Sequence, residues 1–352
     1  MHKIDSSSAV PTMPVPSAPG APGYFAHGSP GGAPYTILTS DWANAIQMEI
    51  CNVITGAGIT LSKNDSSQLL AAINSLVDSG GSGSGSGTGS NRIKLTAPLD
   101  LYVSTTGNDT NNGLTASTPF RTLQKPVNLV YTDYDLAGQT VVVHVANGTY
   151  TAGVLHQRPL TGAISFVGNT TTPTACKVAL TTPGACFASM YGAILTVSGF
   201  ALESSAVESP GYWSPRGMGL MSSWHGSVLF DRIAFGPITY AHMTAGAASF
   251  INVSGNATPY SIYGPAFGHM IAGIGSTIHM PSTVVSITNN PAFTYFAWAN
   301  QGGISAPGVT YTGTATGARY LADSGGFINT NGAGANYFPG SAAGTSTTGY
   351  YT

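Results

Sequence analysis

The segment GSVLFDRIAFG at residues 226–236 decides the fold, because a glycine and a small residue are followed by alternating apolar and polar side chains. Alternation with a period of two is typical of a β-strand with one buried face. Starts of the related segments lie about 21 to 34 residues apart, which suits one turn of a β-solenoid with variable loops. The related segments are QTVVVHVANGTY (139–150), GAISFVGNT (162–170), GAILTVSGFAL (192–202), AASFINVSGNA (247–257), GSTIHMPSTVVSI (275–287) and GGISAPGVTYTG (302–313).

A β-sandwich with Greek-key connections is the alternative all-β fold. Such a sandwich normally shows turn signals every 8 to 12 residues, roughly, and strands paired in hairpins. Asn-Gly pairs, a strong hairpin signal, occur here only in ANGTY, TNGAG and NNGLT. The sequence therefore favours a parallel β-helix over the sandwich. With strand layers about 4.8 Å apart, roughly eight or nine turns would form a rod about 40 Å long.

Composition narrows the classes of function. The 352 residues carry a formal net charge of −2, and 7% of them are charged, against roughly 25% in ordinary soluble domains. This balance argues against nucleic-acid binding and against electrostatic binding to a membrane surface. We expect no membrane insertion, because the chain has no apolar run of about 18 residues. MHKIDSSSAV, at the start, contains no apolar core of a secretory signal.

The first 91 residues divide into three parts. Prolines are dense in residues 1–36, so this part is predicted to be an extended anchoring arm. Residues 37–78 show two apolar stripes at helical spacing, with Thr39 or Ser40 placed to cap the first helix and Ser62 the second. The Gly/Ser-rich residues 79–91 are predicted to be a linker.

Two helices of this size are too short to form a core of their own. The linker behind them offers no packing surface. We therefore expect their apolar stripes to pack against copies of the chain or against another protein. The predicted assembly residues are Trp42, Ile46, Ile50, Val53, Leu69, Ile73 and Leu76.

Three stretches carry a resemblance to a known family. DWANAIQMEICNVITGAGITLSKNDSSQLLAAI (41–73), behind the arm, resembles the amino-terminal module of tail fibres of tailed bacteriophages and their prophage relatives. YVSTTGNDTNNGLTASTPFRTLQKPVNLV (102–130) resembles the entry segment of pectate-lyase-like right-handed β-helices, which are common in fibres and tailspikes. GGFINTNGAGANYFPGSAAGTSTTGYY (325–351) is similar to the ends of such fibres.

The resemblance implies a homotrimeric fibre at the periphery of the virion's tail or baseplate. Residues 1–78 would bind tail or baseplate proteins, and a right-handed parallel β-helix over residues 92–324 would face the host. Residues 325–352 would form a low-complexity end. One departure is Pro126, because proline interrupts a helix where the family's capping helix usually continues. We therefore expect a short or bent helix here, with Phe120, Leu123, Val127 and Val130 on one face.

Polar and aromatic residues are densest in LESSAVESPGYWSPRG (202–217) and just after it. Tryptophan faces stack on sugar rings, and charged groups bind hydroxyls or acidic groups, so this region is the candidate glycan site. The alternative is a surface loop whose tryptophan packs on the rod or on a neighbouring subunit. The candidate residues are Glu203, Glu208, Trp213, Arg216, Trp224 and His225.

No residue is assigned to catalysis, to a metal or to a cofactor. The eight histidines show no metal-binding spacing, and the three cysteines form no cluster. Three functions remain open. The first is a fibre that recognises host-surface glycans or acts as a spacer. The second is a tailspike-type polysaccharide depolymerase, which needs two suitably spaced carboxyl groups. The third is a purely structural adaptor of the baseplate or fibre.

Overall fold

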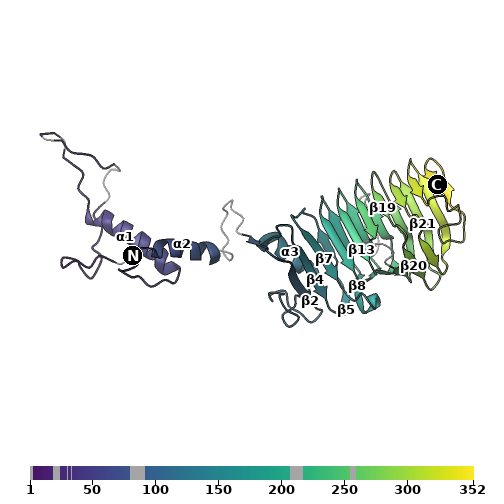
Figure 1. Cartoon of the computed structure of the whole chain (residues 1–352), viewed down its shortest axis with the longest axis horizontal. Coiled ribbons are helices and arrows are strands. Elements are labelled where there is room, and N and C mark those ends of the chain that lie inside the picture. The colour runs from purple at the N-terminus through teal and green to yellow at the C-terminus, as the bar shows by residue number, and fades with distance from the viewer. Residues whose placement is uncertain are drawn as a thin grey trace. The chain divides into compact units, whose positions relative to one another are not determined.

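The computed structural model describes residues 3–18, 24–29, 31–32, 34–79, 92–206, 217–253 and 259–352. The chain forms two compact units, Met1–Asn91 and Arg92–Thr352, which are treated separately below (Figure 1). The predictions for Glu208, Trp213 and Arg216, and for the linker at residues 80–91, fall outside the described residues.

Two helices organise the first unit. α1 (Ser40–Gly56) begins after Thr39, whose hydroxyl accepts a hydrogen bond from the Trp42 amide at 3.3 Å. This is one of the two N-caps that the sequence proposed, and it satisfies an amide that has no partner within the helix. Described residues of the arm contact α1 at several points. For example, the ring centroid of Phe25 lies 5.3 Å from that of Trp42, edge to face.

α2 (Gln68–Ser79) begins six residues after Ser62, so the predicted N-cap at Ser62 is wrong. The side chain of Gln68 explains the later start. It accepts a hydrogen bond from the Ser62 amide at 2.9 Å and donates one to the Thr60 carbonyl at 2.7 Å. These bonds hold the intervening residues in a loop. Asp65 supports the loop by accepting hydrogen bonds from the amide and the hydroxyl of Ser67.

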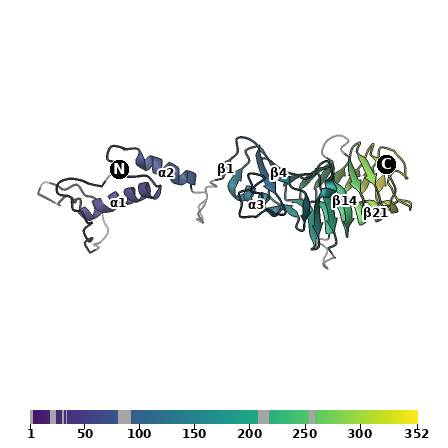
Figure 2. The ribbon, with the colours of Figure 1, turned by 90° about the horizontal axis from the view of Figure 1, so that it is seen from below.

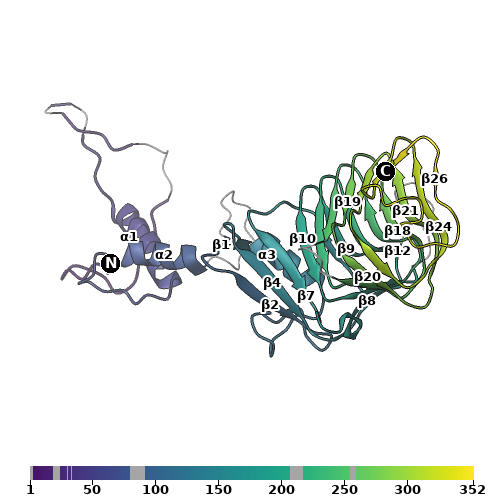
Figure 3. The ribbon, with the colours of Figure 1, turned by 45° about the vertical axis from the view of Figure 1, so that its right-hand side comes forward.

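The second unit is a parallel β-helix with three long sheets, and neighbouring strands of each sheet run parallel (Figures 1 and 3). This confirms the β-helix and excludes the sandwich. The ten-stranded sheet contains β2 (Leu99–Val103), β4 (Thr140–Val145), β7 (Ala163–Val167), β10 (Ile194–Ser198), β13 (Ser227–Asp231), β16 (Phe250–Val253), β19 (Thr277–His279), β22 (Gly303–Ser305), β25 (Phe327–Asn329) and β27 (Tyr350–Tyr351).

The other two long sheets complete each turn. The seven-stranded sheet contains β5 (Gly148–Tyr150), β8 (Cys176–Leu180), β11 (Ala201–Ser204), β14 (Ala234–Ile238), β17 (Tyr260–Ile262), β20 (Val284–Ile287) and β23 (Thr310–Thr312). The eight-stranded sheet contains β6 (Val154–His156), β9 (Gly184–Met190), β12 (Gly217–Ser223), β15 (Ala241–Ala245), β18 (Ala266–Ala272), β21 (Ala292–Asn300), β24 (Thr316–Asp323) and β26 (Thr345–Ser346). The second unit also contains a short parallel pair, β1 (Ile93–Lys94) and β3 (Tyr134–Asp135), and the 3-10 helix η2 (Pro173–Ala175).

Seven complete turns run from β4 to β24, and each gives one strand to each long sheet. The sequence predicted eight or nine. The difference arises because the chain between β2 and β4 builds a cap, and because β25 to β27 add strands to only two of the sheets. Each of the seven sequence segments supplies one strand of the ten-stranded sheet. The spacing of these segments in the sequence therefore equals the number of residues in each solenoid turn.

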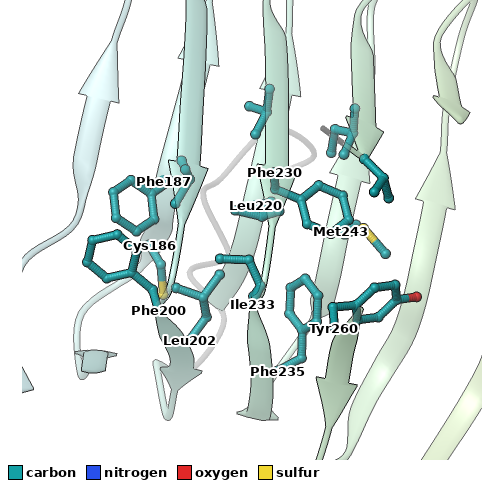
Figure 4. Close-up of a cluster of buried hydrophobic side chains, with 14 of the residues drawn as sticks. Cys186, Phe187, Phe200, Leu202, Leu220, Phe230, Ile233, Phe235, Met243 and Tyr260 are labelled. Atoms are coloured by element: carbon teal, nitrogen blue, oxygen red, sulfur yellow. The ribbon is translucent and has the colours of Figure 1, made fainter. Parts of the chain in front are cut away.

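Inward side chains of successive turns stack into rows and form the core. In one row, Val143, Phe166, Val197 and Phe230 are directly opposite one another on four neighbouring strands, and all four are buried. Figure 4 shows the middle of this core, where aromatic rings from several turns lie together. Because each row repeats at the strand spacing, the apolar interior continues along the whole solenoid.

A short helix, α3 (Gln124–Asp133), belongs to the capping segment between β2 and β4 (Figure 2). The predicted apolar face is confirmed: Phe120, Leu123, Val127 and Val130 are all buried. Pro126 lies in the first turn of the ten-residue helix, where a proline amide would have no partner in any case. The helix therefore starts just before the proline.

The carboxylate of Asp109 ties the capping segment together. It accepts hydrogen bonds from the Arg121 amide at 2.8 Å and from the amide and hydroxyl of Thr122 at 3.0 and 2.7 Å. Partial burial acts to raise the pKa of Asp109, but the bonds from Thr122 and Arg121 outweigh it and lower that pKa. The ionised carboxylate therefore holds the loop against the start of the solenoid.

Candidate functional site

Glu203 projects from β11 on the outer surface of the seven-stranded sheet. Its Oε1 accepts a hydrogen bond from Lys177 Nζ on β8 and another from the Tyr263 hydroxyl, both at 2.7 Å. Burial, and then the hydrogen bond to the carboxylate, raise the pKa of Tyr263, so its phenol remains a donor. The three side chains come from three turns. They form a polar group whose positive and negative charges balance.

A pocket of about 520 Å³ opens beside this group, at the corner between the seven- and eight-stranded sheets. Glu203 forms one wall, and Phe267 with Pro237 and Pro265 supplies apolar surface. Small hydroxyl side chains, among them Thr181 and Ser205, complete the lining. One paired carboxylate, several hydroxyls and an aromatic ring are suited to a neutral, hydroxyl-rich ligand. We call this site the Glu203 pocket.

Trp224 and His225 lie at a different corner, where the chain passes from the eight- to the ten-stranded sheet. Strand β12, seven residues long, separates this corner from Glu203. The structure therefore does not bring these two residues into the Glu203 pocket. The Trp224 side chain is 46% exposed, and its ring stacks on Tyr191 of the preceding turn with centroids 6.4 Å apart.

The corner backbone is unusual. Trp224 and His225 both have a left-handed backbone, with φ of 49° and 63°. Tyr191 and Gln301, at the same corner of other turns, have φ of 54° and 57°. Non-glycine residues rarely adopt such angles, so the stacked turns impose them. The corner therefore presents its aromatic side chains from a rigid support.

A groove of about 880 Å³ crosses the outer surface of the eight-stranded sheet, and it was not predicted from the sequence. Met190, Met218, Met221 and Leu155 contribute apolar surface, and all of its described lining residues are uncharged. We call it the methionine groove. A row of half-buried aromatic side chains lies alongside, consisting of Tyr240, Phe267, Tyr295 and Trp298.

The signal that marks this row is an aromatic residue once per turn. Tyr240, Phe267 and Tyr295 follow one another at the spacing of one solenoid turn, and the rings of Tyr240 and Phe267 are nearly parallel, with centroids 5.7 Å apart. The row was not predicted, because the alternating pattern in the sequence marks strands of the ten-stranded sheet and not those of the eight-stranded sheet.

In the first unit, the predicted assembly residues are incompletely covered. Trp42, Ile46, Ile73 and Leu76 are between 41% and 48% exposed, and Leu70, which was not among the predicted residues, is 63% exposed. Ile50, Val53 and Leu69 are half-buried. The apolar side chains that the two helices do bury are Cys51, Ile54 and Ala72.

Among the described residues, no group of three or more His, Cys, Asp or Glu side chains is arranged to hold a metal ion. In the same part of the chain, no helix has the length and apolar character needed to cross a membrane. Comparison with family models, with curated proteins and with solved structures found no match to the chain.

Proposed function

We propose that the protein is a subunit of a homotrimeric tail fibre of a tailed bacteriophage, located on the virion at the tail or baseplate. The first unit joins the copies and attaches them to tail proteins, and the β-helix faces the host. One observation carries the proposal: the helices of the first unit leave large apolar side chains exposed, including Trp42 at 48% and Ile73 at 46%. An exposed apolar surface of this kind marks a site of protein contact.

The architecture of the second unit supports this role. A parallel solenoid grows by adding turns, so it gives a rigid body with extended surfaces. Three copies on one fibre would present three equivalent sites, and weak sites gain avidity when they are linked. The low content of charged residues, 7% of the chain, favours recognition mainly by hydrogen bonds and aromatic contacts.

The native mass of the purified full chain tests the assembly. We expect three times the chain mass of 35.8 kDa in light scattering, at both low and high salt, because the uncovered residues are apolar. A single chain at micromolar concentration would contradict the proposal. A stable trimer that binds tail proteins but no host cells would instead identify the structural adaptor.

A second function, binding of a host-surface glycan, is favoured by the Glu203 pocket. The carboxylate is held by Lys177 and Tyr263, so its orientation is set before a ligand arrives. Preorganised acceptors of this kind bind sugar hydroxyls with little loss of conformational freedom. Phe267 offers an apolar surface for the C–H groups of a sugar.

Substitution Glu203→Gln should weaken glycan binding about tenfold, because hydrogen bonds to a charged acceptor contribute about 1.5 to 3 kcal/mol. Binding is measured on an array of bacterial capsular polysaccharides and lipopolysaccharides. Asp133→Asn, an exposed change in the capping segment, is the control and should bind like the wild type. Equal binding by Glu203→Gln and wild type would remove the pocket from the proposal, and new reducing ends would identify a depolymerase.

A further inference from the structure

Three polar side chains lie together inside the β-helix, on the inner side of the strand that borders the Glu203 pocket. His242 on β15 and His269 on β18 are 0% exposed, and Tyr260 on β17 is 3% exposed. Phenylalanine rings surround them; for example, Phe235 stacks on His242 with centroids 5.0 Å apart, and Phe296 lies 4.8 Å from His269. The fourth turn supplies His242, and the fifth supplies His269 and Tyr260.

Hydrogen bonds determine where each proton of this group resides. His242 Nε2 lies 3.0 Å from the Gly236 carbonyl oxygen, which can only accept, so His242 carries its proton on Nε2. His242 Nδ1 is then an acceptor, and the proton between it and His269 Nδ1, 3.0 Å away, belongs to His269. His269 Nε2 must accept in turn, from the Tyr260 hydroxyl at 2.8 Å. In this arrangement each imidazole nitrogen has a partner while both rings are neutral.

An added proton disrupts this chain. If His242 is protonated on Nδ1, two N–H groups face each other across the 3.0 Å contact. Relief would require His269 to change tautomer and Tyr260 to turn its hydroxyl toward Met280 Sδ, which lies 3.9 Å away. The positive charge would still lie in an apolar interior, where an unpaired charge is costly. A second proton would place two cations in contact.

Among the residues that the structure describes, the neighbouring titratable groups offer no compensation. Tyr260 faces the pair from β17, and Tyr311 lies close to it on β23; burial raises the pKa of both phenols, so they are neutral. Glu203 lies on the outer side of Gly236 and is already paired with Lys177. The side chains of β14 and β21 that pack against the two histidines are Phe235, Phe293 and Phe296, which carry no charge.

We propose that the His242–His269–Tyr260 chain is an acid-sensitive latch between the fourth and fifth turns of the β-helix. It closes the interior while both imidazoles are neutral, and protonation of the pair opens the solenoid at these turns. The latch acts whatever ligand the outer surface binds. It would make the body of the protein respond to an acidic environment.

The direction of the pH effect follows from the burial. Burial lowers the pKa of His242 to about 3 and lowers that of His269 well below its ordinary value of 6.5. His242 and His269 therefore bind protons in the opened chain at pH values where they stay neutral in the closed chain. Closure is fully favoured above about pH 6.5 and is lost as the pH falls below that value. Each of the two imidazoles raises the opening constant by up to about tenfold per pH unit.

Hydrogen exchange of the full chain between pH 6 and pH 5 measures this uptake. After correction for the intrinsic pH dependence of exchange, the opening constants of β15 and β18 should rise by up to about a hundredfold per pH unit. Buried His156, whose pKa burial lowers to about 4, adds to the global unfolding background. In His269→Gln only one imidazole of the pair remains, so the opening constant of β15 should rise about tenfold less per pH unit than in the wild type. His144→Gln, at a half-buried histidine on the outer side of β4, is the control and should leave it unchanged.

Nitrogen-15 NMR of labelled histidines keeps the test decisive if the variant does not fold. At pH 7, the wild-type protein should show His242 as the Nε2–H tautomer and His269 as the Nδ1–H tautomer. Neither resonance should titrate down to pH 5 in the closed protein. Titration of either imidazole with the turns still closed, or the same slope in His269→Gln and wild type, would overturn the latch.

Discussion

Aspartate at both Ile46 and Ile73 should convert the assembled protein into single chains. These side chains are 44% and 46% exposed in one copy, so the change costs little within the chain itself. Full burial of an isoleucine in an assembly contributes about 1.5 to 3 kcal/mol, and an unpaired buried carboxylate costs several kcal/mol more. Three copies would bear this cost at every subunit. We therefore expect the affinity between subunits to fall by several orders of magnitude. Light scattering across a dilution series measures this fall.

A matched control distinguishes the effect of charge within the apolar stripes from the effect of added net charge alone. Asn52→Asp and Asn74→Asp add the same two charges at exposed positions of the same helices. This control should retain the native mass, since neither asparagine belongs to the apolar stripes. If both double variants dissociate alike, net charge and not helix contact sets the assembly. If neither does, the contacts lie elsewhere.

Phe187→Ala should produce the largest loss of stability of any single change considered. The Phe187 side chain is 0% exposed, and its ring lies 5.6 Å from Phe166 and 5.0 Å from Phe200, centroid to centroid (Figure 4). Truncating a buried phenylalanine costs about 3 to 5 kcal/mol, because contacts are lost and a cavity remains. Urea unfolding followed by circular dichroism should show a clearly lower midpoint.

The matched control is Ile194→Ala on the neighbouring strand β10. Ile194 is 50% exposed, and surface changes of this kind usually fall within about 0.5 kcal/mol. Because each turn contacts only its neighbours, hydrogen exchange in Phe187→Ala should increase first in the strands next to β9. An unchanged midpoint would show that Phe187 is not part of the structural core.

The ten-stranded sheet could be predicted because its strands bury one face only. In β4, β7 and β13 buried and partly exposed residues alternate strictly, and this period of two is visible in the sequence. β12 and β18 are buried on almost every residue. Alternation is then lost, which is why the eight-stranded sheet and its aromatic row were not predicted.

The candidate site shows the same division. Glu203 was a reasonable candidate from its local sequence, but Tyr263, which fixes its orientation, lies 60 residues further along the chain. Trp224 was grouped with Glu203 because it was expected one turn later in the solenoid. In the solenoid a seven-residue strand carries the chain from one corner to the next, so sequence neighbours reach different surfaces.

Local periodicity and composition by themselves determined that this chain forms the strands of a β-solenoid, and that its two helices carry apolar stripes. These properties are local because they depend on neighbours two to four residues apart. Only the tertiary structure decided which side chains of different turns meet, as in the Glu203 pocket and the His242–His269 pair. The stacking register brings together residues one or two turns apart in the sequence, and no local pattern encodes that register.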